Sequence, residues 1–407
     1  MLKASLRVLL VAAAIGASYY SALLARAAYL FEGNTAASVG AAARLVPYNS
    51  RYVARLGAWE SDRRWAQFHR AIELNPFDSE SWIQLGLLTE LDRQDPQAAE
   101  RYYLKAAAVD HMFLPKWTLT NFYFRRQNEH QFFEWANATL KITPYAADPV
   151  FAQMWQMTRD AGQIGAAVPQ RPRVLLQYAG FLSNSKRFAS ISPVVQRLVN
   201  SVPARDAHAW GRDDLLAGIE DRLLTAGELD AALKVWTSMK RAGWIRATIP
   251  DSEHPLTSGD FSFPSYGHGF DWTMADVAGV TIDQLTDLRS LRISLSGEQP
   301  ERCELLRQYI PVEPGREYEL LWVAKAPQIT LPSGFAWHVR KAGESACSIC
   351  SSMVSGDLLD ATEGGWHFRA PAGANLCTLI LEYARPFGAV RGAGSINLES
   401  VSLTRQP

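Results

Sequence analysis

The chain is poor in the residue types that carry most enzymatic and metal chemistry. Its 407 residues include four cysteines and eight histidines, and no two histidines have the i, i+4 spacing of a helical metal site. The cysteines all lie in the last third, at Cys303, Cys347, Cys350 and Cys377. A single Cys-x-x-Cys pair favours a local disulfide or two free thiols over zinc, which takes four ligands. The sequence therefore predicts no metal and no cofactor, and leaves the disulfide pairing open.

No charge of either sign is in excess. The 41 basic and 41 acidic residues give a net charge of zero. Because a nucleic-acid partner requires a basic surplus to neutralise phosphates, none is predicted. No nucleophile with an adjacent base has a recognisable signature, which predicts that the protein is not an enzyme. A polysaccharide-modifying enzyme stays open as a third alternative, since a carboxylate pair such as Asp271 and Glu382 need not be close in sequence.

One long uncharged run stands near the amino terminus. Residues 8–25 contain no charge, follow Lys3 and Arg7, and precede Arg26. As a helix the run is about 27 Å long, close to the roughly 30 Å of bilayer hydrocarbon, so residues 1–30 are predicted to be a membrane anchor. A signal peptide cleaved at Ala25-Arg26-Ala27 is the alternative, disfavoured by the charged Arg26 and the length of the run. A buried core helix is the third interpretation.

The charges around this run predict its orientation. Lys3 and Arg7 precede it, and the positive-inside rule leaves the short tail in the cytoplasm. The rest of the chain is then exported, to the periplasm or another extracytoplasmic space. Disulfides are permissible there.

A helical repeat pattern follows the apolar run. The chain resembles the tetratricopeptide repeat, a helix pair of about 34 residues in which small residues allow close approach and aromatic residues fill the space between pairs. The resemblance rests on one motif and on Trp117, 35 residues after its first tryptophan: Trp82-x-x-Leu85-Gly86 followed by Ala99-x-x-x-Tyr103-x-x-Ala106. It implies an α-solenoid over residues 31–245 that binds a protein partner.

Helical periodicity extends beyond that motif. Residues 35–46 are predicted to form a helix that ends at Pro47-Tyr48-Asn49, and residues 172–243 again show apolar residues at helical spacing. We expect four to five helix pairs between residues 35 and 243, with an irregular middle. Several arginines, including Arg51 and Arg55, could line a groove for an acidic partner, although interspersed Glu and Asp favour a solvated helix face.

The pattern changes at Gly243. Residues 246–269 are rich in proline and glycine and are predicted to be a linker. Beyond them, alternating or apolar runs separated by turns predict a β-sandwich of about eight strands over residues 270–407. The runs lie at residues 291–295, 305–312, 318–323, 335–339, 366–368, 377–383 and 396–403. The predicted fold class is therefore a multidomain α + β protein, with a transmembrane helix, an α-solenoid and a jelly roll.

The second half resembles the jelly-roll carbohydrate-binding modules over residues 270–404. The likeness rests on the Pro314-Gly315 turn before a core strand, on Trp366-x-Phe368 before Pro371, and on the closing strand; Glu399-Ser400 departs from the pattern near Val401. The resemblance implies a glycan ligand. Because sugar rings stack on aromatic faces, the candidate contacts are Trp272, Trp337, Trp366 and Tyr383, each of which could instead fill the core.

Together these features predict a non-catalytic, membrane-anchored scaffold. Its helical repeats bind a protein partner, and its β-sandwich binds glycan or a second protein. Helical repeats, a jelly roll and a leading membrane segment resemble the layout of bacterial envelope proteins linked to exopolysaccharide production. The alternative is a protein-interaction adaptor whose β-sandwich is a purely structural cap. Exposure separates the two, since a glycan module needs open aromatic faces and a cap buries them.

Overall fold

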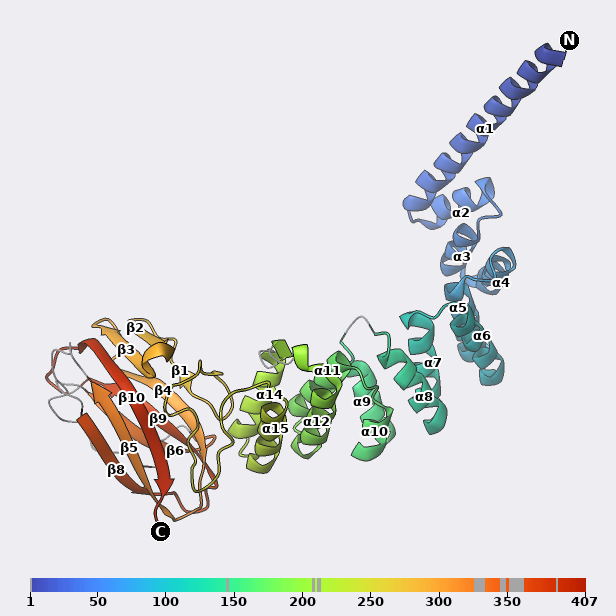
Figure 1. Cartoon of the computed structure of the whole chain (residues 1–407). Coiled ribbons are helices and arrows are strands. Elements are labelled where there is room, and N and C mark those ends of the chain that lie inside the picture. Colours follow the sequence, from blue (N-terminus) through green and yellow to red (C-terminus); the bar gives the residue numbers. More distant parts are fainter. Residues whose placement is uncertain are drawn as a thin grey trace. The chain divides into compact units, whose positions relative to one another are not determined.

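The structure is a computed structural model of the whole chain (Figure 1). It describes residues 2–143, 146–206, 209–210, 214–325, 334–344, 349–350, 362–385 and 387–407. The chain forms two compact units, Met1–Pro169 and Gln170–Pro407. The predicted fold class is confirmed: helices come first, one of them long and apolar, and two antiparallel sheets follow.

The first unit is helical throughout the described residues, and its helices pack in succession. The pairs α3 with α4, α5 with α6, and α7 with α8 are in contact, and each second helix also contacts the next pair. The shorter helices α9 and α10 follow, as the expected irregular middle. The bounds are α1 Leu2–Glu32, α2 Ala36–Leu45, α3 Ser50–Trp59, α4 Arg64–Leu74, α5 Ser79–Leu91, α6 Pro96–Val109, α7 Phe113–Arg125, α8 Glu129–Leu140, α9 Asp148–Met157 and α10 Ala161–Ala167.

The best-formed pair, α5 and α6, shows why the repeat motif folds as it does. Asp78 caps α5 through the backbone N–H of Ser81, and Asp95 caps α6 with proline as the first helical residue. Between the helices, a Cβ on Gly86 would lie 2.4 Å from the ring of Tyr103, which is fully buried. The glycine therefore provides the space that the tyrosine occupies. Trp82 is half-buried and donates its indole N–H to the carbonyl of Pro76 at 2.8 Å.

Helix α1 is continuous through the predicted cleavage site and ends at Glu32. Among the residues that the structure describes, one helical segment is long and apolar enough to cross a bilayer, Leu9–Glu32. A segment of this kind suits a membrane anchor or a signal sequence. Its last turns are also part of the folded unit, because Ala27 is fully buried with Ala42, Ala43, Val46 and Tyr52.

The second unit contains the remaining helices and the β-sandwich. Its helices are α11 Pro172–Asn184, α12 Ile191–Ser201, α14 Asp214–Thr225 and α15 Leu229–Arg241. The strands are β1 Thr273–Met274, β2 Val280–Leu285, β3 Ser290–Ser296, β4 Arg302–Pro311, β5 Glu317–Lys325, β6 Phe335–Lys341, β7 Ile349–Cys350, β8 Thr362–Arg369, β9 Leu376–Ala384 and β10 Ala393–Arg405. They form two five-stranded antiparallel sheets, β1-β4-β9-β6-β7 and β2-β3-β10-β5-β8.

The sandwich core lies between the two sheets. It contains residues from nearly every strand, including Leu291, Leu305, Tyr318, Leu379 and Val401. Six of the seven predicted strand runs fall within a strand, and the seventh, 305–312, extends one residue past the end of β4. Strands β1, β2 and β7 were not predicted. The departure at Glu399 has a structural reason: a bulge interrupts the register of β10 between Leu398 and Ser400, and Glu399 pairs with Lys325 at 2.6 Å.

Residues 246–269, here called the strap, are not a free linker, which corrects the predicted domain boundary. The compact units divide at residue 169, so the strap, the sandwich and helices α11, α12, α14 and α15 belong to one unit. Phe261 of the strap lies in the sandwich core, and Gly259 accepts a backbone hydrogen bond from Val401 at 2.8 Å. On the other side, Tyr266 of the strap and Phe270, which directly follows the strap, pack edge-to-face on Trp236 of α15. Proline and glycine end helical structure here, but the aromatic residues among them provide apolar surface to bury.

Candidate binding sites

The first candidate site is a pocket of about 790 Å³ in the helical unit. It lies among α1, α3 and α5, the first members of successive helix pairs, with Phe68 of α4. Pockets for small molecules or peptide side chains have volumes of this order. The alanines Ala28, Ala54 and Ala58 are part of the lining, and their small side chains leave room between the helices.

Two arginines dominate the polar side of this pocket. The Arg51 guanidinium lies 5.1 Å from the centre of the Phe31 ring, and Arg55 donates to the Asn34 Oδ1 from Nε at 3.0 Å and from Nη2 at 2.8 Å. Both arginines are exposed. Glu32, Asp78 and Glu80 also line the pocket, so its charge is mixed. The sequence drew attention to Arg51 and Arg55, but Phe31 and Asn34 carried no signal because they come from the end of α1 and the turn after it.

The residues predicted to stack on sugar are mostly in the sandwich core. Trp272, Trp337 and Tyr383 have exposed fractions of 1%, 1% and 0%, so none offers a ring face to a ligand. Trp337 lies against Trp272 and Trp322, and the Tyr383 hydroxyl accepts the backbone N–H of Gly392 at 2.8 Å. The structure corrects the expectation for these three: they pack the space between the sheets.

Trp366 differs from the other three. It lies on the edge strand β8, is half-buried, and packs against Phe368 with ring centroids 4.9 Å apart. Gly364 on the same strand leaves space for Trp322, since a Cβ there would lie 2.2 Å from that indole. Of the four predicted contacts, Trp366 alone keeps part of its surface in solvent.

A second candidate surface is the outer face of the sheet that contains β4, β6 and β9. Leu379, Leu381 and Tyr383 face the core, so the alternate residue Glu382 faces outward. Glu382 is nevertheless buried, with Arg302 Nε at 2.7 Å and His338 Nε2 at 3.5 Å from its Oε1.

A further ion pair joins β6 and β4, the two strands that flank β9, with Arg340 Nη1 2.9 Å from Glu304 Oε1. Burial lowers the pKa of His338, against the opposing effect of Glu382. The shift favours the neutral imidazole, which can both accept and donate hydrogen bonds. The surface offers hydrogen-bonding groups rather than aromatic platforms.

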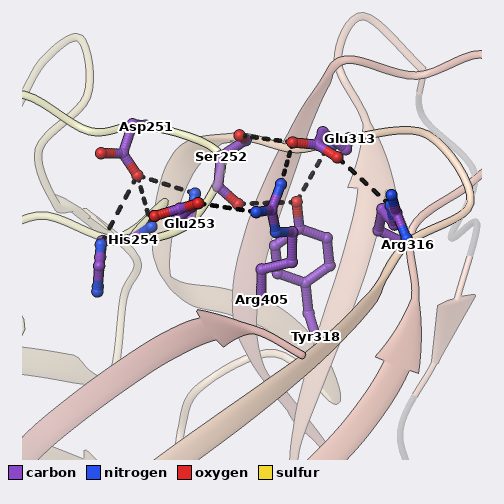
Figure 2. Close-up of polar contacts among 8 residues, drawn as sticks. All are labelled: Asp251, Ser252, Glu253, His254, Glu313, Arg316, Tyr318 and Arg405. Carbon is purple, nitrogen blue, oxygen red and sulfur yellow. Dashed lines mark hydrogen bonds and ion pairs between the residues drawn. The ribbon is translucent and has the colours of Figure 1, made fainter. Parts of the chain in front are cut away.

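A third cluster joins the strap to the sandwich (Figure 2). Arg405, at the end of β10, pairs with Glu253 at 2.8 Å and with Glu313. The Tyr318 hydroxyl donates to the carbonyl of Ser252 at 3.0 Å and accepts the N–H of Glu313 at 2.9 Å. Glu313 also accepts from the Ser252 hydroxyl at 3.0 Å. These partners come from segments far apart in sequence, and no local sequence pattern predicted their contacts. Their role is to hold the strap on the sheet.

The strap also contacts the last helices through Gly267-His268-Gly269. Asp221 of α14 accepts the N–H of Gly269 at 2.9 Å and lies 2.7 Å from His268 Nδ1. Its neighbour Glu220 is fully buried, and neither of its carboxyl oxygens has a hydrogen-bond partner among the described residues. Burial, with a smaller effect of Asp221, raises the pKa of Glu220 well above its ordinary value. Glu220 therefore keeps its proton to a higher pH than an exposed glutamate does, and it packs against Gly269 of the strap.

The remaining predicted groups have structural surroundings. Cys377 is buried in the sandwich core and Cys303 packs against it; both are free thiols. Cys347 and the side chain of Cys350 lie outside the described residues. Asp271 is buried and accepts the backbone N–H groups of Tyr266 and Trp272. Within the described residues, no group of three or more His, Cys, Asp or Glu could hold a metal ion.

These features define a protein of stacked helix pairs followed by a two-sheet β-sandwich. No protein-family model matches the sequence, and no curated protein matches it. Solved structures are similar to parts of the chain, and three of them are described below.

A module described as "CBM4 structure and function" is 14% identical, with a TM-score of 0.26, over 34% of this chain and 88% of its own. A second structure, from the functional characterisation of Pseudomonas aeruginosa pilF, is 16% identical over 47% of this chain and 91% of its own, with a TM-score of 0.26. The third is a carbohydrate-binding module of Cellvibrio mixtus lichenase 5A in complex with cellotriose, 12% identical over 33% and 92%, with a TM-score of 0.20. At these scores the likeness assigns no ligand to this chain.

Proposed function

We propose that the protein is a membrane-anchored adaptor that binds a peptide segment of a protein partner in the pocket among α1, α3 and α5. It acts by recognition, without turnover. The observation that carries the proposal is the pocket itself, because its lining combines apolar side chains with groups that bond a peptide backbone. Alanines and Phe68 accept apolar side chains, while Arg55, Gln84 and Asn75 offer donors and acceptors.

The anchor is retained in this proposal. Cleavage after Ala27 would remove Leu23 and Ala27, which pack against α2 and α3, from the first core of the helical unit. That loss would expose the apolar faces of Ala42 and Val46. With Lys3 and Arg7 on the cytoplasmic side, the pocket stands outside the cytoplasm, close to the membrane. A role in envelope or exopolysaccharide assembly fits this position, because the partner would then also lie outside the cytoplasm at the membrane.

Site-specific photo-crosslinking tests the binding role. A photoreactive residue at Ala58, which is exposed and lines the pocket, is introduced into the full chain in its native membranes. We expect a discrete protein adduct whose cross-linked residues form one continuous segment, identified by mass spectrometry. Arg51→Ala combined with Arg55→Ala should reduce the adduct several-fold.

The matched control is a probe at Ala66, an exposed alanine on the neighbouring helix α4 that does not line the pocket. It should give little of the same adduct. Equal cross-linking from both positions, or adducts with lipid alone, would overturn the proposal. Circular dichroism of the double variant shows whether the helical unit is still folded.

The β-sandwich acts mainly as a structural cap in this proposal. Its aromatic residues are largely committed to its own core, and the strap ties it to α14 and α15. This arrangement favours the adaptor over an aromatic glycan platform. A glycan role would have to use the polar outer face around Arg302 and Glu382, because such groups can bond sugar hydroxyls.

Glycan binding is the second candidate, and calorimetric titration of oligosaccharides into the protein tests it. Binding that disappears in Arg302→Ala, whose side chain is two-thirds exposed, would support that face as the site. Arg369→Ala removes an equally exposed arginine from the opposite sheet and serves as the control. Binding that is unchanged in Arg302→Ala would exclude this face.

A further inference from the structure

The turn after α2 reaches back along the membrane helix. The hydroxyl groups of Tyr48, in the turn Pro47–Asn49, and of Tyr20, on α1, lie 2.6 Å apart. Helix α2 packs along the second half of α1 through Ala42, Ala43 and Val46. Tyr48 therefore lies level with residue 20 of α1, well inside the apolar segment Leu9–Glu32.

This position constrains how deeply α1 enters the bilayer. The last carbonyl groups of α2 have no partners within the helix, and a turn with such groups is not tolerated in hydrocarbon. If the hydrocarbon reached Ala25, as the apolar run alone predicts, Tyr20 and the turn beside it would lie about 8 Å below its surface. Tyrosine prefers the headgroup region, where its ring is in apolar surroundings and its hydroxyl is in polar ones.

The exposed side chains at this level fit the headgroup region. Tyr19, Tyr20 and Tyr48 have exposed fractions of 72%, 48% and 52%. Arg44, in the last turn of α2, is exposed as well and can meet lipid phosphates. An aromatic band with an adjacent arginine is the composition found where membrane proteins cross the interface.

We propose that Tyr19, Tyr20, Arg44 and Tyr48 form a lipid-headgroup docking site that seats the first helix pair in the bilayer interface. The inference rests on the proposed membrane anchor and adds a second contact, made by the folded unit itself. The spanning part of α1 then lies on the amino-terminal side of Tyr19, within Leu2–Ser18, a helical length of about 26 Å.

The docking site also locates the binding pocket. Ala28 and Phe31 of α1 line the pocket and lie about 12 to 17 Å along the helix beyond Tyr20. The pocket therefore lies one to two helix diameters along α1 from the level of Tyr20, on the side away from the bilayer. The partner segment that fits this height is the juxtamembrane part of another membrane protein.

Depth-dependent fluorescence quenching tests the docking site. An environment-sensitive fluorescent amino acid replaces Tyr48 in the full chain, reconstituted in vesicles of phosphatidylethanolamine and phosphatidylglycerol. The matched control carries the same probe at Ala37, an exposed residue at the other end of α2. We expect lipids labelled at the headgroup to quench position 48 several-fold more than position 37, and aqueous iodide to do the reverse.

The outcomes separate the two proposals. Protein that does not float with the vesicles contradicts the anchor. Protein that floats but shows equal iodide quenching at positions 48 and 37 overturns the docking site and leaves the anchor standing. Stronger quenching of position 48 by lipids labelled deep in the acyl chain than by headgroup-labelled lipids also overturns it, since the turn would then lie in hydrocarbon.

Discussion

Close contacts between single residues determine how the helix pairs assemble. Gly86 lies against the ring of Tyr103, whose hydroxyl donates to Glu90 at 2.8 Å, and Glu90 in turn pairs with Arg125 of the next helix pair at 2.7 Å. Burial, with the Glu90 hydrogen bond, raises the pKa of Tyr103 far above its ordinary value, so the tyrosine stays a hydroxyl donor. The space left by Gly86 thus lets Tyr103 bond to Glu90, which links this helix pair to the next one through Arg125.

Gly86→Ala should destabilise the helical unit. The added Cβ overlaps the Tyr103 ring and forces the helices apart, at a cost of about 1–3 kcal/mol in the free energy of unfolding. Urea denaturation of the variant measures the loss.

Gly165→Ala in α10 is the control, because a Cβ there meets nothing within 4 Å. It should be neutral or stabilise the unit by up to about 1 kcal/mol through helix propensity. Equal destabilisation by both changes would contradict the packing argument.

Glu220 predicts a pH dependence of the second unit. Because its pKa is raised in the fold, the folded state binds this proton more tightly than the unfolded chain does. The stabilisation is complete below the ordinary pKa of 4.5 and is lost as the pH rises through the folded pKa. The free energy of unfolding should therefore fall as the pH rises above about 4.5 and through the raised pKa of Glu220, and Glu220→Gln should flatten this slope.

Thermal unfolding across that pH range measures the slope. Glu298→Gln removes an exposed carboxyl and controls for the change in net charge. If stability falls with pH as steeply in Glu220→Gln as in the wild-type protein and in Glu298→Gln, a different group is responsible.

At the scale of elements, the strap is the segment whose behaviour depends most on distant partners. Arg405, Tyr318 and Glu313 hold Ser252 and Glu253 near its start, and Phe261 anchors its middle in the core. Arg405→Ala should raise hydrogen exchange at residues 251–254 and lower stability by about 1 kcal/mol, since the pair is only partly buried.

The comparison variant is Arg369→Ala. Arg369 pairs with Glu317 at 2.8 Å, but both side chains are more than half exposed, so the change should cost close to nothing. Unchanged exchange in the strap of Arg405→Ala would mean that Phe261 alone holds it.

The elements themselves were largely predictable, because their signals act over a few residues. Asp78 and Asp95 cap helices, and alternation in residues 377–383 indicates a strand. Strand β2, Val-Thr-Ile-Asp-Gln-Leu, was missed since its register with β3 depends on pairing rather than on a bounded apolar run. The two-residue strands β1 and β7 carry too little sequence to stand out.

At the scale of the whole molecule, the bounds of the compact unit Gln170–Pro407 predict which fragments of the chain fold by themselves. Residues 170–407 should fold cooperatively, because they keep the strap and the helices that it contacts. Residues 270–407, bounded as the sequence pattern suggests, lose Phe261 from the core and the Gly259 to Val401 hydrogen bond. They should aggregate or unfold at a much lower temperature.

Calorimetry and heteronuclear NMR of the two fragments measure this difference. Residues 246–407 form an intermediate case, with the strap but without the helices. Identical unfolding temperatures for the fragments that begin at 170 and 270 would restore the sequence-based boundary.

The sequence by itself determined the order of the parts: an apolar helix, stacked helix pairs and a sandwich. Periodicity, caps and turns depend on interactions between residues that are close in the chain, so they can be recognised from the sequence alone. Only the tertiary structure decided which aromatic rings are buried, because Trp272, Trp322 and Trp337 come from three separated segments and exclude water only when assembled. It likewise decided that the pocket lies at the end of α1 and that the strap belongs to the sandwich, since both depend on contacts between segments far apart in the chain.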